Sequence, residues 1–257
     1  MSTSRRDLIL FLAGPGVIAL AVAALFQVVA WPTLPRTGQA QALGLGATAI
    51  CIGLGAIGAM LSTGVGCPTA PRLGDWSRWR RIVAWGLGGG FAYGAFDLGI
   101  YAWTPWGAHL TAIDHANGYT WANVALPWSV AHYLHGAIEL ESVYRLTLIV
   151  IPAWLICRLF LKGRFEAWIF WTFTALAALV EPLEKAIILR KLPLADMGPL
   201  DLAMNLEAIA SQVLYALVLR RFGWPAPILM RYGYYLVVRV FGAYLFPYTS
   251  EMYPGQH

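Results

Sequence analysis

The sequence predicts an all-α protein, a polytopic transmembrane helix bundle with about seven spans and one further interfacial or re-entrant helix. Composition is the first observation: 59% of the residues are hydrophobic and only 12% are charged, about half the charged fraction of a soluble domain. The second is that apolar runs of about 20 residues, long enough to cross a bilayer, recur along the chain. The third is that lysine and arginine gather in alternate connecting segments.

One integral membrane domain is expected over residues 1–257, because no segment has the composition of a linker or a soluble appendage. The first apolar run follows Arg5 and Arg6 and is too long for the core of a cleavable signal peptide. The segment "ANGYTWANVALPWSVAHYLHG" is aromatic and moderately apolar, so it is the expected interfacial or re-entrant piece. The expected spans cover about 8–30, 41–63, 80–103, 139–162, 165–187, 199–221 and 225–247.

The distribution of basic residues orients these spans. With the N-terminus in the cytoplasm, 11 of the 18 lysines and arginines fall in cytoplasmic segments, 4 fall outside and 3 lie within or near spans. This predicts a multi-pass protein of the cell (inner) membrane with its C-terminus outside. The net charge of +5 is then explained by topology, so the expected partners are the lipid bilayer and a membrane protein or membrane-embedded peptide, with no nucleic acid.

Glycines and cysteines limit the alternatives. The three cysteines form no CxxC pair, so neither a disulfide framework nor a zinc cluster is indicated. Gly53-x-Gly55-x-x-Gly58 matches a dinucleotide fingerprint only formally, because it lies inside an expected span with no strand before it. Gly90 and Gly94 are four residues apart, a spacing that lets helix backbones approach closely in lipid.

Ionisable residues gather where the fourth span begins. In a continuous helix His132, His135 and Glu139 share one face, and imidazoles with a carboxylate suit zinc or iron. The alternative is that the histidines belong to an aromatic-rich helix at the level of the lipid headgroups. Both interpretations stay open on the sequence.

Glu141 and Arg145 share roughly the opposite face of that helix. They form either an intrahelical ion pair in which each neutralises the other, or a carboxylate held by arginine to activate water. Arg231 and Arg239 lie eight residues apart on a similar face of the seventh span, where they compensate buried carboxylates such as Glu184. We expect these side chains to converge in one polar chamber.

The segment from about 135 to 245 resembles a degenerate member of the CAAX-protease and bacteriocin-processing family of intramembrane proteases. "Glu141-Ser-Val-Tyr-Arg145" is similar to the second glutamate and the arginine of that family's Glu-Glu-x-x-x-Arg motif. "FEAWIFWTFTALAALVEPLEK" and "RRFGWPAPILMRYGYYLVVRV" resemble its two later helices, but Glu184 and Arg231 stand in place of the motif histidines and Tyr235 stands in place of the final Asn or Asp. Leu140 stands in place of the first glutamate.

The resemblance implies a glutamate-dependent intramembrane endopeptidase, a hydrolase. Glu141 would be the base and Arg145 its orienting partner, with Glu184, Arg231 and Arg239 as secondary polar elements. The alternative hypothesis is a non-enzymatic membrane scaffold or an accessory subunit of a larger membrane complex, with the glycine-rich spans packed against partners. A carrier for protons or anions is a third hypothesis, although no internal repeat of the kind common in transporters is visible.

Overall fold

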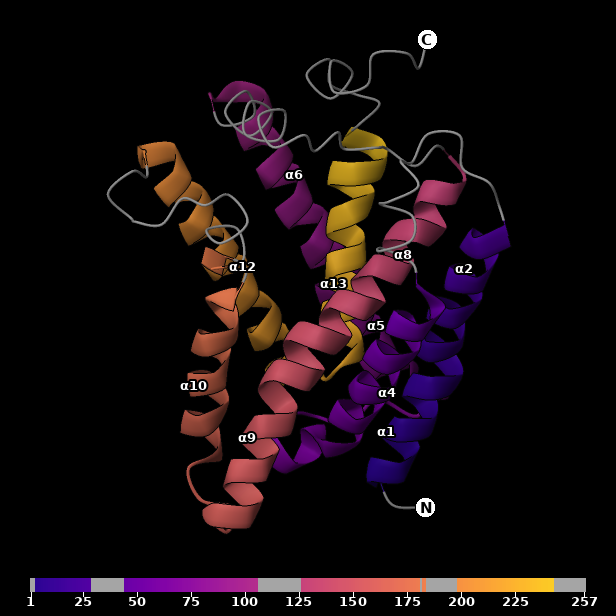
Figure 1. The fold of residues 1–257 in the computed structure, drawn as a ribbon, viewed down its shortest axis with the longest axis vertical. Helices are drawn as coiled ribbons and strands as arrows, with labels where there is room; N and C mark the ends of the chain where they lie inside the picture. Colours follow the sequence, from indigo (N-terminus) through magenta and orange to yellow (C-terminus); the bar gives the residue numbers. More distant parts are fainter. Residues whose placement is uncertain (1–2, 29–43, 106–125, 181, 184–197, 243–257) are drawn as a thin grey trace.

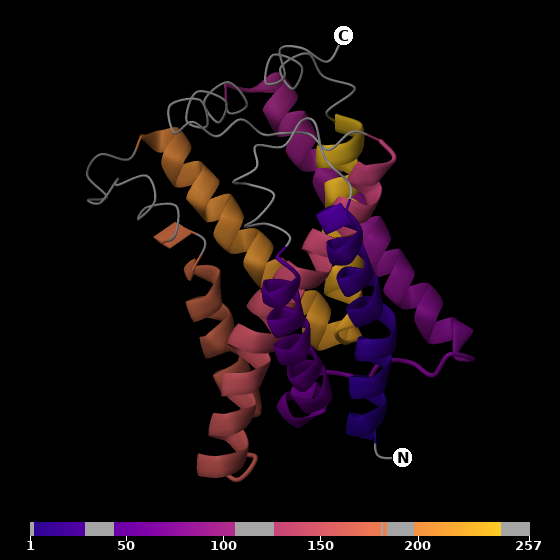
Figure 2. The ribbon, with the colours of Figure 1, turned by 45° about the vertical axis from the view of Figure 1, so that its right-hand side comes forward.

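The computed structural model describes residues 3–28, 44–105, 126–180, 182–183 and 198–242. Within these ranges the chain is helical and contains no strand, which confirms the expected all-helical class. Successive helical segments run in alternating directions along the long axis of the molecule (Figures 1 and 2).

The segments divide into rods, most of which join α-helical and π-helical stretches. Their bounds are α1 (Thr3–Phe11), η1 (Leu12–Gly16) and α2 (Val17–Val28); α4 (Leu45–Leu61) and η2 (Ser62–Val65); α5 (Trp76–Val83), η3 (Ala84–Gly88) and α6 (Gly89–Trp103); α8 (Trp128–Glu141), η4 (Ser142–Val150), α9 (Ile151–Leu155) and η5 (Ile156–Phe160); α10 (Glu166–Ala178); α12 (Pro199–Phe222); and α13 (Pro225–Tyr235) with η7 (Leu236–Phe241).

Among the described residues, four helices are long and apolar enough to cross a membrane, namely Ser4–Gln27, Leu45–Val65, Trp128–Phe160 and Leu202–Phe222. They coincide with four of the expected spans. The third of them differs from expectation, because residues 128–136 were assigned to a separate interfacial or re-entrant piece. They are instead the first turns of one helical rod that continues to Phe160.

Prolines accompany two of the π-helical stretches. Pro15 lies inside η1, and Pro152 is the second residue of α9, which follows η4. A proline has no backbone N–H and crowds the preceding turn, so the regular hydrogen-bond ladder is interrupted there. In η4 the first wide turn carries Arg145, four residues after Glu141.

Glycines set the distance between neighbouring helices. A Cβ atom built on Gly58 of α4 would overlap the carbonyl oxygen of Leu146 in η4, and one on Gly90 of α6 would overlap the carbonyl oxygen of Met230 in α13. This confirms that Gly90 permits a close helix approach. Gly58 and Gly90 therefore pack against helices of this same chain, whereas the scaffold hypothesis assigned the glycine-rich spans to contacts with partners.

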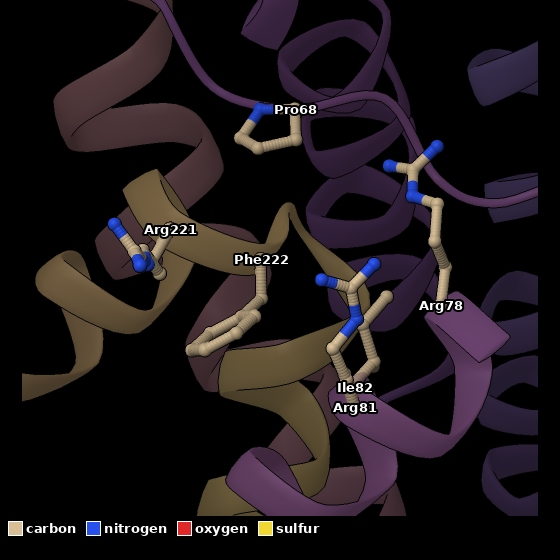
Figure 3. Close-up of a pocket in the computed structure, with 6 residues that line it drawn as sticks. All are labelled: Pro68, Arg78, Arg81, Ile82, Arg221 and Phe222. Atoms are coloured by element: carbon tan, nitrogen blue, oxygen red, sulfur yellow. The ribbon is translucent and has the colours of Figure 1, made fainter.

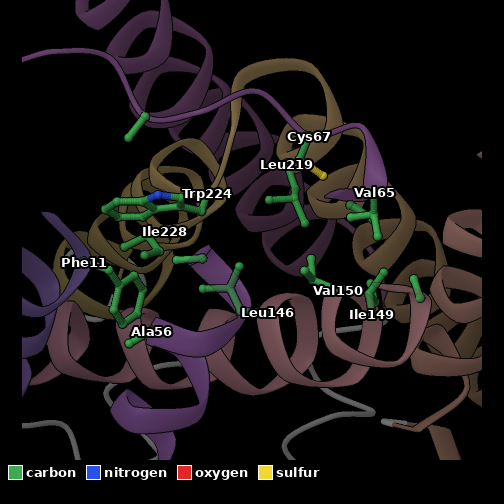
Figure 4. Close-up of a cluster of buried hydrophobic side chains, with 14 of the residues drawn as sticks. Phe11, Ala56, Val65, Cys67, Leu146, Ile149, Val150, Leu219, Trp224 and Ile228 are labelled. Atoms are coloured by element: carbon green, nitrogen blue, oxygen red, sulfur yellow. The ribbon is translucent and has the colours of Figure 1, made fainter. Parts of the chain in front are cut away.

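The main hydrophobic core lies where α1, α4, η4 and α13 meet (Figure 4). Phe11 packs edge-on against Trp224, with ring centroids 5.1 Å apart. Leu146, Ile149 and Val150 of η4 are at most 1% exposed and contribute the central layer. The core thus fixes η4, and with it Arg145, against the other helices.

Arginines hold the segment between η2 and α5. Arg6 donates to the Ala70 carbonyl at 2.7 Å, Arg78 to the Thr69 carbonyl at 2.7 Å, and Arg220 to the Val65 carbonyl at 2.7 Å. Three helices therefore attach to one connection by hydrogen bonds from guanidinium groups to backbone carbonyls.

Candidate functional site

The buried centre of the molecule holds one carboxylate between two guanidinium groups. Glu141 ends α8, and Arg145 lies one turn later in η4, with its Nε 3.3 Å from Glu141 Oε2. Arg231 of α13 donates from Nε to Glu141 Oε1 at 2.5 Å. Arg145 also donates from Nη1 to Oε1 of Gln212 in α12. Side chains from three rods therefore meet at Glu141, and we call these four residues the Glu141 cluster.

A tyrosine covers the cluster. The guanidinium carbons of Arg145 and Arg231 lie 5.1 and 4.5 Å from the ring centroid of Tyr215, within the range of cation–π attraction. Glu141 and Arg145 are each 1% exposed, and Tyr215 is 2% exposed. Water is therefore largely excluded, and the charged groups interact mainly with one another.

The cluster has more positive than negative charge. Two guanidinium groups face one carboxylate. Nε and Nη2 of Arg145, Nη2 of Arg231 and Oε2 of Glu141 are buried without a hydrogen-bond partner among the described residues. Buried polar groups without partners are costly. The arrangement can therefore do two things chemically: it can tie three rods together through charge, and it can offer N–H donors to a further negative oxygen.

The structure brings together three of the five residues expected to be catalytic: Glu141, Arg145 and Arg231. Arg239 lies elsewhere, where it interacts electrostatically with Asp97, Tyr133 and Tyr234. Glu184 lies outside the described residues, so the expected joint chamber is not tested at that position.

The cluster member Gln212 and the covering residue Tyr215 are absent from the residues expected from the sequence. A glutamine inside an apolar span is a weak signal, because its partner is 67 residues away and no local spacing connects the two. Tyr215 is indistinguishable by sequence from the many aromatic residues of the chain.

The expected metal site does not assemble as a triad. His135 Nε2 lies 3.4 Å from Glu139 Oε1, and the Thr48 hydroxyl lies within 3.1 Å of His135 Nε2 and donates to Glu139 at 2.5 Å. His132 instead contacts the rings of Phe26 and Tyr133 edge-on. Among the described residues, no three His, Cys, Asp or Glu side chains group closely enough to hold a metal ion, so the site does not fit zinc or iron.

Comparisons with known proteins identify no relative, so any proposal about function depends on the geometry of the residues described above. No protein-family model matches this chain, and neither the curated proteins nor the solved structures searched contain a match. The resemblance to the intramembrane proteases therefore remains an expectation from the sequence.

Proposed function

We propose that this chain is a non-enzymatic integral membrane protein, a scaffold or accessory subunit with an intramembrane-protease-like arrangement of polar residues. The observation that carries this proposal is the state of Glu141: its carboxylate is 1% exposed and each of its oxygens faces an arginine. A general base needs a hydrogen-bonded water or substrate within reach. Glu141 instead joins α8, η4 and α13, so its role is to hold helices together.

We further propose that the protein crosses the inner membrane about seven times, with the N-terminus in the cytoplasm. The four long apolar helices supply four crossings. The rod from Trp76 to Trp103, the helix α10, and the rod from Pro225 to Phe241 supply the others. Support comes from chain direction, because these rods alternate with the apolar ones along the long axis of the molecule (Figure 1).

A hydrolase is the second candidate, and one observation favours it. Nη2 of Arg145 and Nη2 of Arg231 are buried donors without an acceptor in the described structure. Donors of this kind stabilise the oxyanion that forms during acyl transfer. In that case a membrane-embedded peptide would approach the two arginines, and Glu141 would orient them.

The two candidates are separated by substituting Glu141 and its partners. In the scaffold proposal Glu141→Gln leaves two buried guanidinium groups uncompensated, and we expect it to lower the free energy of unfolding by about 3–5 kcal/mol. Arg231→Gln leaves the Glu141–Arg145 pair neutral, so its effect should be smaller. Chemical unfolding of the purified protein in detergent gives both values.

The matched control is Glu139→Gln, an acid on the same helix whose side chain is 19% exposed, which should cost less than Glu141→Gln. Cleavage of a panel of membrane-embedded peptides is measured in parallel on the same samples. A Glu141→Gln protein that keeps its full stability and loses a peptidase activity of the parent would establish the hydrolase and overturn the scaffold.

A further inference from the structure

A cavity of about 230 Å³ lies beside the connection between η2 and α5. Its walls come from that connection, from α5 and from the end of α12. Figure 3 shows Phe222 between Arg221 on one side and Arg81 on the other. The lining residues are Pro68, Arg78, Arg81, Ile82, Arg221 and Phe222, and we call this cavity the arginine pocket.

The arginine pocket carries an excess of positive charge. Within the described part of the chain, neither Arg81 nor Arg221 has a hydrogen bond or an ion pair through its side chain, and both are exposed. Arg78 uses Nη2 for the Thr69 carbonyl. Asp75 acts electrostatically on Arg78 and Arg81, and Asp7 acts on Arg78. Asp75 Oδ1 already accepts from Ser77 and from the Arg78 backbone.

The other side of the arginine pocket is apolar and aromatic. Ile82 is 2% exposed and forms its floor. Phe222 stacks on Trp85 with ring centroids 5.7 Å apart, and Trp85 is itself 60% exposed. Trp76, at the start of α5, is 69% exposed. Exposed tryptophans beside arginines are typical of the membrane–water interface.

We propose that the arginine pocket binds a phosphate group, either that of an anionic phospholipid headgroup or that of free phosphate. Guanidinium groups bind phosphate oxygens through paired N–H donors, and Arg78, Arg81 and Arg221 provide such donors from two helices. The Trp85–Phe222 surface gives the acyl part of a lipid an apolar surface to lie on. A basic pocket of this kind at the cytoplasmic side matches the negative charge of that leaflet.

The inference goes beyond the proposed function, since it concerns a different end of the bundle from the Glu141 cluster. The phosphate site ties the end of α12 to α5 through a shared anion. A lipid bound there would therefore join two rods that the connection at Pro68 already brings together.

The test is a titration of the purified protein, in uncharged detergent, with dioctanoyl phosphatidylglycerol, dioctanoyl phosphatidylcholine and inorganic phosphate, each followed by native mass spectrometry. We expect saturable binding of phosphatidylglycerol, weakened at least about tenfold in the Arg81→Gln/Arg221→Gln variant. The Arg81→Lys/Arg221→Lys variant keeps both charges and should bind with intermediate affinity, because the planar donors are lost.

The matched control is Arg72→Gln/Arg80→Gln, which removes the same charge from two exposed arginines of the same region that do not line the cavity. Its affinity should stay within about twofold of the parent, since only the general field changes. The thermal unfolding of both double variants is recorded so that each comparison is made on folded protein.

The source of the phosphate is decided by competition. If inorganic phosphate binds with the same dependence on Arg81 and Arg221 and displaces phosphatidylglycerol, the ligand is free phosphate. If only phosphatidylglycerol binds in this way, the ligand is a lipid headgroup. The proposal is overturned if neither probe binds, if the Arg81→Gln/Arg221→Gln variant binds like the parent, or if the Arg72→Gln/Arg80→Gln control loses affinity equally.

Discussion

Glu141 shows how a single side chain can define the interior of this bundle. Its arginine partners come from four and from 90 residues away in the chain. An ion pair removed from water stabilises a fold only when its geometry is good and its remaining polar atoms are satisfied. The Glu141 cluster brings these charges together from three rods, but it leaves three guanidinium nitrogens and Glu141 Oε2 without a hydrogen-bond partner among the described residues, so charge balance is the property most sensitive to substitution.

A second buried carboxylate gives a prediction at this scale. Asp97 of α6 is 1% exposed and accepts a hydrogen bond from the Tyr234 hydroxyl at 2.5 Å. Tyr234→Phe removes that donor from a charged acceptor, and we expect it to lower the free energy of unfolding by about 1.5–3 kcal/mol. Urea unfolding in detergent measures the change.

Tyr93 provides the control for Tyr234→Phe. Its ring stacks on Tyr234 at 5.1 Å, and no hydrogen bond to its hydroxyl is found in the described part of the chain. Tyr93→Phe keeps the stacking and should change stability by less than about 0.5 kcal/mol. Equal losses in the two variants would show that the loss does not depend on the hydrogen bond from Tyr234 to Asp97.

The spacing of residues along the sequence predicted the polar contacts that lie within one helix. Glu141 and Arg145 are four apart and do pair, as an i, i+4 spacing indicates. His135 and Glu139 likewise come together, but His132 does not join them, because its ring packs against Phe26 of the first rod. Arg231 was expected in the same polar chamber as Glu141, but no spacing predicted their direct pairing, because it depends on how two helices far apart in the sequence are placed.

At the scale of elements, backbone contact between helices depends on particular glycines. Gly58→Ala would place a methyl group against the Leu146 backbone, so α4 and η4 would have to separate. We expect a loss of about 1–3 kcal/mol in the free energy of unfolding, measured by denaturant titration of the purified protein.

Gly53 lies on the same helix and is the matched control. A Cβ atom there would have no heavy atom within 4 Å. Gly53→Ala should therefore leave stability unchanged or raise it by up to about 1 kcal/mol through helix propensity. If both substitutions raise the free energy of unfolding, α4 and η4 do not approach as closely as described.

The start of α5 gives a prediction that depends on pH. The Asp75 carboxylate caps this helix by accepting from the Arg78 backbone N–H at 3.2 Å, and this bond holds the pKa of Asp75 below its ordinary value. Because the folded pKa is the lower one, the stabilisation is present above the unfolded pKa and is lost as pH falls through the folded pKa.

Amide hydrogen exchange in residues 76–83 should therefore quicken as the solution is acidified through that range, after correction for the intrinsic rate. Asp75→Asn keeps a capping oxygen but cannot titrate, so its exchange should show no such step. If the exchange rates of the parent protein and of the Asp75→Asn variant depend on pH in the same way, a group other than Asp75 causes the effect.

The lengths of the apolar runs predicted the positions of helices better than they predicted where each helix begins and ends. Three of the four long apolar helices, Ser4–Gln27, Leu45–Val65 and Leu202–Phe222, were expected within a few residues of where they lie. The rod that begins at Trp128 was not, because its first turns are aromatic and only moderately apolar, and hydropathy alone divides such a rod at the polar residues His132–Glu141. Those residues are instead covered by neighbouring helices, which a single-segment pattern does not report.

At the scale of the whole molecule, the distribution of the arginines agrees with the alternating directions of the helices. The ends of α1, α5, α9–η5 and α12 that carry arginines lie in the same half of the bundle (Figure 1). Residues of that half also form the arginine pocket. One half is therefore strongly basic, as expected for the cytoplasmic side of a membrane protein.

The number of crossings can be tested at two positions that bracket the rod from Trp76 to Trp103. If that rod spans the membrane, Gly74 lies in the cytoplasm and Thr104 lies outside; if only the four long apolar helices span it, both positions lie on the same side. Gly74→Cys and Thr104→Cys are therefore introduced singly into a chain carrying Cys51→Ala and Cys157→Ala. Cys67 is retained, because burial raises the pKa of its thiol to about 12 and leaves it unreactive near neutral pH. In intact cells an impermeant maleimide should label Thr104→Cys and spare Gly74→Cys, which should react only after the cells are opened. Labelling of the two positions under the same condition would exclude a crossing between them and reduce the bundle from about seven spans.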